Sequence, residues 1–246
     1  MTPATTEPMT QELFREDAAL DDCEARIVAL GETGVQLDRT VFYPLGGGQA
    51  GDRGELRLAD GRVLQIADTR KGAAPGEIVH VPAPGQDDLL AGLAVDQPVT
   101  ARIDRARRAR HMRFHTATHL LCALVPHPVD GCSITADSAR LDFHMTEPLD
   151  KDALTAGLAR LVAGAHPVRH RWISEAELDA NPGLVRSMSV QPPRGLGRVR
   201  VLEIEGVDLQ PCGGTHVANT ADIGEVVVTK IEKKSAQTRR VVLGFR

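Results

Sequence analysis

Two short stretches, far apart in the sequence, carry pairs of side chains that can bind a metal ion. The first is HTATH at residues 115–119, and the second is CGGTH at residues 212–216. In a helix, histidines four residues apart lie one turn from each other on the same face and can bind one ion together. A thiolate with imidazoles is a ligand set that suits zinc. The two stretches therefore predict a zinc site made of His115, His119, Cys212 and His216.

Either stretch alone would be weak evidence, because a histidine pair at this spacing is common and is more often structural. Together they gather three of the nine histidines and one of the four cysteines into two pairs of equal spacing. The segment between His115 and His119 lacks the glutamate of a His-Glu-x-x-His metallopeptidase, so we assign no side-chain general base. The catalytic group that we expect is a zinc-bound water, whose pKa the ion lowers towards neutrality.

The number of ligands leaves two interpretations open. Four protein ligands would close a tetrahedral zinc, whereas a catalytic zinc usually keeps one position open. One ligand, most readily His216, is loosely held in the first interpretation, or substrate binding expands the coordination. In the second, the zinc is purely structural.

Composition and cysteine usage restrict the class of protein. A hydrophobic share of 42% with 25% charged residues is ordinary for a soluble globular chain, and 246 residues suffice for one large domain or two modest ones. No signal peptide or close cysteine pairing is evident, and no apolar run reaches membrane-spanning length, so we expect a cytoplasmic protein. Aromatic residues make up only 3%, which excludes base stacking as a general binding strategy.

Charge is distributed unevenly along the chain. Residues 1–100 carry 8 Lys+Arg and 17 Asp+Glu, whereas residues 101–246 carry 21 and 16. A polyanionic partner is therefore expected to meet the second half, although a solvated basic face without a partner is the alternative. Arginines cluster just before the first histidine pair, and the candidates for phosphate contacts are Arg105, Arg108 and Arg113.

The pattern of short strands and turns predicts an α+β protein of two domains. Residues 1–98 show evenly spaced short strands, which favour a small barrel or sandwich. The glycine-rich segment 46–54 is by itself more typical of a plain turn. Residues 99–246 predict helices on a mostly antiparallel sheet, with Asp104 capping the histidine helix and residues 132–143 forming one strand.

Three phrases of the sequence carry a resemblance to a known family: FYPLGGGQ at 42–49, RFHTATHLL at 113–121 and QPCGGTHV at 210–217. They resemble the editing domain of alanyl-tRNA synthetases, and most of all its free-standing relatives of medium size, the AlaX-M proteins. The resemblance covers nearly the whole chain from about residue 10, and the three phrases stand in the family's order.

The resemblance implies a zinc-dependent aminoacyl-tRNA deacylase that acts in trans on mischarged tRNA(Ala), chiefly on the seryl ester, with the glycyl ester as a further candidate. It implies the four zinc ligands named above and a small N-terminal β-barrel. In the family the glycine-rich loop lies against the active-site cleft, which places Gly47, Gly48 and Gln49 near the substrate and replaces the turn-only interpretation.

Selection of serine needs a group that hydrogen-bonds its hydroxyl, because such a site rejects an analogue without the hydroxyl by about 10⁴-fold or more. Thr116 and Gln49 are the candidates, and each could equally be a cap or a solvated residue. Two other functions remain open: a non-catalytic zinc-containing tRNA-binding module, and a zinc hydrolase for another ester.

Overall fold

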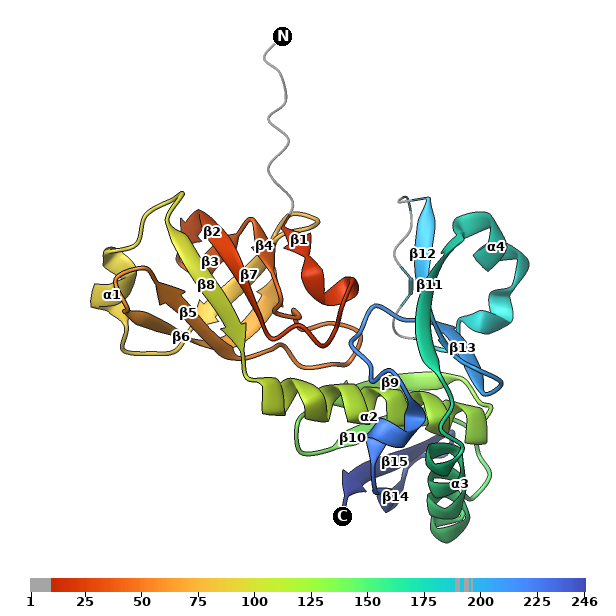
Figure 1. The fold of residues 1–246 in the computed structure, drawn as a ribbon. Helices are drawn as coiled ribbons and strands as arrows, with labels where there is room; N and C mark the ends of the chain where they lie inside the picture. Colours follow the sequence, from red (N-terminus) through yellow and green to blue (C-terminus); the bar gives the residue numbers. More distant parts are fainter. Residues whose placement is uncertain (1–9, 189–190, 193–194, 196) are drawn as a thin grey trace. The chain divides into compact units, whose positions relative to one another are not determined.

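The computed structural model describes residues 10–188, 191–192, 195 and 197–246 (Figure 1). The chain forms two compact units. Unit 1 consists of the residues up to Gly46 together with Ala50–Arg108, and unit 2 consists of Gly47–Gln49 together with Ala109–Arg246. Within the described part of the chain, no helix combines the length and the apolar character needed to cross a membrane.

Unit 1 is a closed antiparallel barrel with the strand order β2-β3-β7-β6-β5-β8 (Figure 1). Inward-facing side chains such as Ile27, Leu37, Leu64 and Ala101 are fully buried. The predicted small N-terminal barrel is therefore confirmed. Its strands are β2 (Asp22–Gly31), β3 (Gly34–Leu37), β5 (Gly54–Leu58), β6 (Val63–Lys71), β7 (Ile78–Pro82) and β8 (Pro98–Ile103), and the unit also contains β1 (Gln11–Glu12), η1 (Leu13–Arg15), β4 (Arg39–Thr40) and α1 (Asp87–Ala91).

The boundary expected between residues 98 and 99 is corrected by strand β8. This strand pairs with β2 on one side and β5 on the other, and so closes the barrel. A cut before it would leave two open sheet edges, which are costly because their backbone groups lose their partners. The division falls instead at Arg108, inside the helix α2 (Arg105–Leu124).

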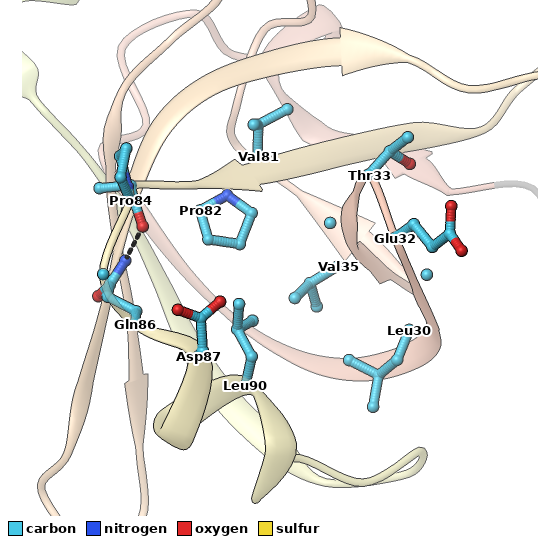
Figure 2. A pocket seen from close by; sticks show the side chains of 14 residues that line it. Leu30, Glu32, Thr33, Val35, Val81, Pro82, Pro84, Gln86, Asp87 and Leu90 are labelled. Atoms are coloured by element: carbon cyan, nitrogen blue, oxygen red, sulfur yellow. Dashed lines mark hydrogen bonds between the residues drawn. The ribbon is translucent and has the colours of Figure 1, made fainter.

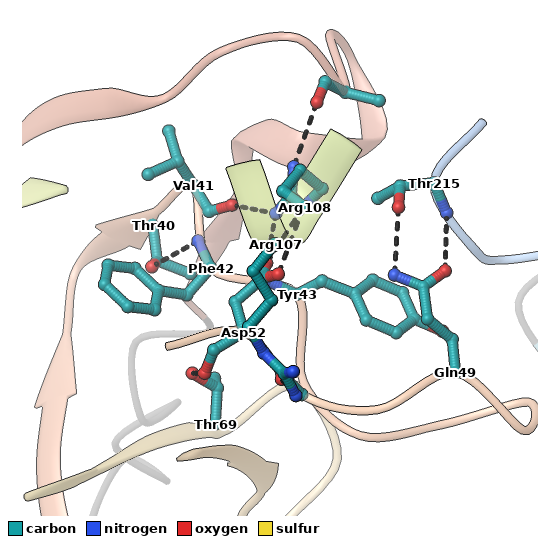
Figure 3. A network of polar contacts seen from close by, with 12 residues as sticks. Thr40, Val41, Phe42, Tyr43, Gln49, Asp52, Thr69, Arg107, Arg108 and Thr215 are labelled. Atoms are coloured by element: carbon teal, nitrogen blue, oxygen red, sulfur yellow. Dashed lines mark hydrogen bonds and ion pairs between the residues drawn. The ribbon is translucent and has the colours of Figure 1, made fainter. Parts of the chain in front are cut away.

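A buried ion pair fixes the end of unit 1 (Figure 3). The guanidinium of Arg108, 2% exposed, contacts the carboxylate of Asp52 and donates to the carbonyl oxygens of Val41, at 2.6 Å, and Ala18, at 3.0 Å. Asp52 also accepts from the backbone nitrogen of Tyr43 at 2.7 Å. Breaking such a pair leaves a buried uncompensated charge. Arg108 is thus a structural residue, and the expectation that it contacts RNA is withdrawn.

One end of the barrel holds a pocket of about 280 Å³ (Figure 2). It is lined by residues 30–35 and 81–87 together with Leu90. Its lining mixes apolar side chains such as Val35 with the carboxylates of Glu32 and Asp87, without the phosphate-binding glycine pattern of a nucleotide site.

Unit 2 is built on an antiparallel sheet with the order β14-β15-β10-β9 (Figure 1). Helix α3 (Lys151–Ala163) begins at Asp150, whose side chain caps the nitrogens of Asp152 and Ala153. The segment 132–143, predicted as one strand, is a hairpin, because Thr135 accepts hydrogen bonds that form a turn there. The four strands are β9 (Val129–Ile134), β10 (Ala139–His144), β14 (Val226–Ser235) and β15 (Thr238–Phe245).

A second antiparallel sheet of unit 2 has the order β11-β12-β13. A capping box between Ser174 and Glu177 is present at the start of α4 (Glu175–Ala180). The α+β class with mostly antiparallel sheets is thus confirmed. The remaining elements are β11 (Val168–Ser174), β12 (Arg198–Ile204), β13 (Asp208–Pro211), η2 (Pro182–Leu184) and η3 (Thr220–Ile223).

His80 makes the stability of unit 1 dependent on pH. Its ring is fully buried, with Nδ1 3.0 Å from the carbonyl oxygen of Val35 and Nε2 2.8 Å from the hydroxyl of Thr40. Burial lowers the pKa of His80 to about 4, although the bond to Val35 opposes this. His80 is therefore protonated below about pH 6.5 in the unfolded chain, but only below about pH 4 in the folded chain.

We expect the free energy of unfolding to fall as the pH drops from about 6.5 to about 4, with a contribution from His80 of about 3 kcal/mol. Urea unfolding followed by circular dichroism measures it. The His80→Gln variant should be less stable at neutral pH, and the difference from the wild type should shrink towards pH 4. A difference that stays constant over this range would contradict the role of His80.

Candidate metal centre

Helix α2 positions the first histidine pair. It contains no glycine or proline, its first turn is capped by the Asp104 carboxylate, which accepts from the nitrogen of Arg107 at 3.0 Å, and Pro126 follows its end. Burial of an apolar side chain stabilises the fold by about 1.5–3 kcal/mol, so the helix is held firmly in the core of unit 2. Its fully buried apolar residues are Phe114, Ala117, Leu120 and Leu121.

The loop after β13 positions the second pair. Arg200 donates from Nη1 to the carbonyl oxygens of Cys212, at 2.9 Å, and Gly214, at 3.2 Å. A Cβ atom at Gly214 would lie 2.1 Å from Cε1 of His115. Only glycine therefore lets the loop approach the ring of His115 this closely.

The four predicted ligands lie together. The ligand atoms of His115, His119, Cys212 and His216 all lie within 4.8 Å of one another. The sulfur of Cys212 is 3.2 Å from Nε2 of His216 and 3.5 Å from Nε2 of His115. Tetrahedral zinc with ordinary bond lengths separates sulfur and nitrogen by about 3.5 Å. The arrangement is therefore compatible with a metal site, and the donor set fits zinc.

Each histidine directs the same nitrogen into this cluster, because a different acceptor holds the other. Nδ1 of His119 is 2.8 Å from the Asp208 carboxylate, and Nδ1 of His115 is 2.8 Å from Oε1 of Gln49. Nδ1 of His216 is 3.2 Å from the hydroxyl of Thr116. An Nδ1–H that is hydrogen-bonded leaves the lone pair on Nε2 for a metal.

The other hydrogen bonds of Gln49 and Thr116 determine which ring nitrogen of His115 and of His216 carries the proton. Gln49 accepts from the nitrogen of Thr215 at 3.2 Å and donates to its hydroxyl at 2.9 Å, which fixes the orientation of the amide (Figure 3). The Thr116 hydroxyl donates to the carbonyl of Met112 at 2.9 Å, so it accepts from His216. These bonds set both imidazoles in the tautomer that a metal requires.

The segment Gly47–Gln49 belongs to unit 2 because it lies along β9. The nitrogen of Ile134 donates to the Gly48 carbonyl at 2.7 Å, and Gln49 forms a parallel bridge with Ile134. Gly48 has a φ of +87°, and a Cβ there would lie 2.8 Å from the sulfur of Cys132. Glycine is therefore required for the chain to place Gln49 against His115.

Electrostatics in the cluster favour a metal-binding thiolate. Burial would raise the pKa of Cys212, but the charges of His115 and His216 and hydrogen bonds from His115 and His119 hold it well below its usual value. By contrast, burial raises the pKa of Cys122 and Cys132 to about 12 each, so both stay thiols. Of these three cysteines, Cys212 is thus the one suited to bind a metal as a thiolate.

The histidines of the cluster differ in their protonation. Burial lowers the pKa of His216 to about 3, with the charge of His115 acting in the same direction. Burial would also lower the pKa of His119, but the hydrogen bonds to Asp208 and Cys212 raise it to about 10. Metal binding must therefore displace a proton from His119, and metal affinity should rise with pH.

The residues expected to contact substrate or RNA fall in different places. Thr116 and Gln49 are fully buried, and their polar atoms are engaged by the cluster. Arg113 donates to the carbonyl of Ile223 at 2.7 Å and lies over the ring of Phe245. Of the three arginines expected to bind RNA, only Arg105 has a largely exposed side chain, with Asp21 at 3.6 Å.

Sequence reasoning missed the residues that support the ligands. Asp208 is buried, accepts from Gln210 with both oxygens, at 2.9 and 3.0 Å, and has Arg186 at 3.9 Å. Arg200 was likewise not singled out. No fixed spacing marks such residues, and the only available signal was the alternation of β13, which places Asp208 and Gln210 on one face.

Comparison with known proteins connects the site to translation. Residues 199–242 match the family model described as the threonyl and alanyl tRNA synthetase second additional domain, a range that includes Cys212 and His216. The chain is 32% identical over 237 residues to the alanyl-tRNA editing protein AlaX-M of Saccharolobus solfataricus, with 95% of this chain and 98% of the relative covered. It is 34% identical over 242 residues to AlaX-M of Methanosarcina barkeri, with the same coverage.

A longer relative shares the same region. The chain is 36% identical over 236 residues to the alanine–tRNA ligase of Metallosphaera sedula, covering 92% of this chain and 25% of the ligase. The similarity thus extends over nearly all of this chain but only a quarter of the ligase.

Loss of the carboxylate behind His119 should weaken metal binding. We expect one zinc ion per wild-type chain, and a decrease in zinc affinity of about 10- to 100-fold in Asp208→Ala, because the ring of His119 loses its orientation and basicity. Competition with a chromophoric chelator measures the affinity. The matched control is Asp222→Ala, an exposed carboxylate of unit 2 that should leave zinc affinity unchanged. Equal affinities of wild type and Asp208→Ala would contradict this role.

Proposed function

Because the chain belongs to the AlaX-M family of alanyl-tRNA editing proteins, we propose that it hydrolyses the ester of mischarged tRNA(Ala) in trans. The seryl ester is the main substrate in this proposal, and the glycyl ester is a second one. The observation that carries it is the convergence of four metal-binding side chains from two distant motifs on one point of unit 2. A buried cluster of this kind suits chemistry on a bond that must be activated.

The proposed cofactor is zinc, held by His115, His119, Cys212 and His216. When bound, zinc polarises an ester carbonyl and lowers the pKa of a coordinated water. The chain's own residues hold the ligands in the required tautomers. Asp208 is already engaged by His119 and Gln210, so it is not a free base, and we still assign no side-chain general base.

We propose that His216 is the ligand that leaves the metal when substrate binds. Its Nδ1 contact, 3.2 Å to a neutral hydroxyl, is longer than the 2.8 Å contacts that hold His115 and His119. A hydrogen bond to a neutral hydroxyl is also weaker than one to a carboxylate. This inequality supports a site that binds zinc with four residues and exchanges one of them for substrate.

The glycine-rich segment has an indirect part in this proposal. Gly47 and Gly48 bring Gln49 to His115, and the amide of Gln49 is occupied by His115 and Thr215. We therefore propose that Gln49 acts on the substrate through the orientation of His115. The backbone of Gly47 and Gly48 remains the proposed substrate contact of this segment.

Arg105 is the proposed contact to the tRNA phosphates among the arginines considered. Its side chain is 80% exposed, and an exposed ion pair such as that with Asp21 contributes little. Phosphate contacts of this kind position an RNA without reading its sequence.

A deacylation assay tests the function directly. We expect release of serine from Ser-tRNA(Ala), with the alanyl ester spared by about 10⁴-fold because a site built for a hydroxyl leaves polar groups unpaired without it. Glycine also lacks the hydroxyl, so we expect its ester to be hydrolysed much more slowly than the seryl ester. A chelator should abolish the activity and added zinc should restore it. Cys212→Ser should be inactive, whereas Cys23→Ser, in unit 1, should be active.

Two outcomes would overturn the proposal. Zinc and tRNA binding without release of any amino acid would indicate a non-catalytic binding module. Hydrolysis of small esters that tRNA does not inhibit would indicate a hydrolase for another substrate.

Thr116→Val separates a positioning role from a substrate contact. Since the Thr116 hydroxyl is engaged by Met112 and His216, we expect similar losses on the seryl and glycyl esters, with a weaker zinc affinity of about 10- to 100-fold. A loss confined to the seryl ester, with zinc affinity unchanged, would instead show the serine-hydroxyl contact that the sequence suggested. Thr155→Val, a threonine of helix α3, is the control.

A further inference from the structure

The sheet β11-β12-β13 has two faces of different character. Residues directly opposite in an antiparallel pair share a face, and successive residues alternate. Trp172 is opposite Arg200, and Ile204 is opposite both Val168 and Asp208. Trp172, Arg200 and Asp208 therefore share one face. The other face carries Ile173, Val199 and Val201, which form a small core with Leu178.

The face that carries Trp172 is directed to the metal centre. Asp208 holds the ring of His119, and Arg200 donates to the backbone of Cys212 and Gly214. Trp172 is the cross-strand neighbour of Arg200, and Arg200 in turn contacts the loop that carries Cys212.

The ring of Trp172 remains accessible there. Its side chain is 45% exposed, and few other large apolar side chains of the described residues are exposed. Trp172 is also the only tryptophan in the sequence. The guanidinium of Arg198 lies over it, with Cζ 4.5 Å from the ring centroid. An exposed indole beside an arginine is suited to a flat aromatic group that carries negative charge nearby.

The charges on this face of the sheet are mostly positive. Arg198, Arg200 and His170 lie on it, and burial followed by the charge of Arg200 lowers the pKa of His170. Among the described residues of the three strands, the only acidic side chain on this face is Asp208, which is buried against His119. The surface therefore favours an anion and disfavours a cationic peptide.

We propose that Trp172 and Arg198 form a stacking site for a nucleobase of the single-stranded 3′ end of the aminoacylated tRNA. The inference rests on the proposed function, because an RNA ester held at the metal centre would bring its terminal bases to the face of the sheet that carries Trp172. The base stacks on the face of the indole ring opposite to Arg198, and Arg198 meets the adjoining phosphate. One ring at one place agrees with a chain in which aromatic residues are scarce.

The sole tryptophan is a direct reporter of this contact. Titration of the wild-type protein with uncharged tRNA(Ala) should quench Trp172 fluorescence saturably. The same tRNA with its unpaired 3′ nucleotides removed should bind with much less quenching. Equal quenching by intact and trimmed tRNA, or none by either, would overturn the stacking site.

Variants test the contribution to affinity. We expect Trp172→Ala and Arg198→Ala each to weaken binding of end-labelled tRNA(Ala) about tenfold, with Trp172→Phe recovering most of the loss, since phenylalanine keeps a stacking surface. The matched control is Arg171→Ala, which removes the same charge from the opposite face of β11 and should change affinity little. Similar effects of Arg198→Ala and Arg171→Ala would reduce the role of Arg198 to general charge and overturn the proposed site.

Hydrolysis separates this proposal from the proposed function. If the function holds, Trp172→Ala should raise KM for Ser-tRNA(Ala) about tenfold and leave kcat and zinc content unchanged, whereas an unchanged KM overturns the stacking site alone. If the wild type hydrolyses no ester, quenching that depends on the 3′ end still supports the stacking site while the proposed function fails. Zinc content and circular dichroism identify any variant that fails to fold, and Trp172→Phe then decides.

Discussion

The structure of unit 2 depends on one constraint: three imidazoles and a thiolate are buried together, and every polar atom among them needs a partner. The three Nδ1 atoms find their partners in Asp208, Gln49 and Thr116. The three Nε2 atoms and the sulfur of Cys212 are left facing one another, with the sulfur 3.2 Å from Nε2 of His216 and 3.5 Å from Nε2 of His115. A shared cation is the partner that satisfies all four at once, since a buried polar group without a partner is costly.

This constraint explains why distant segments converge. The acceptors come from the glycine-rich segment, from helix α2 itself and from strand β13, so the cluster ties three parts of unit 2 together. Two contacts around the cluster are close enough to require a glycine, at Gly48 against Cys132 and at Gly214 against His115. The glycines of the two sequence phrases are thus explained by packing within the site as much as by contact with a substrate.

Local signals in the sequence predicted the local structure. The spacing of His115 and His119, the cap at Asp104 and the even spacing of the barrel strands are short-range patterns, and the structure contains what they predict. Long-range pairing carries no such pattern. Nothing near Arg108 indicates that its charge is buried against Asp52, and nothing near Gln49 indicates that its amide meets His115. The hairpin at Thr135 was missed because apolar residues recur on both sides of the turn, at Ile134 and Ala136 and again at Leu141 and Phe143.

The three acceptors are unequal, and this inequality bears on how a site with four protein ligands can act on a substrate. A carboxylate raises the basicity of an imidazole most, an amide oxygen less and a hydroxyl least. Nε2 of His216, whose ring is held by a hydroxyl, is therefore the weakest imidazole donor of the set. Zinc affinity would then come mainly from Cys212, His119 and His115. In the proposed site, release of His216 would therefore cost the least and would open the position that the proposed hydrolysis needs.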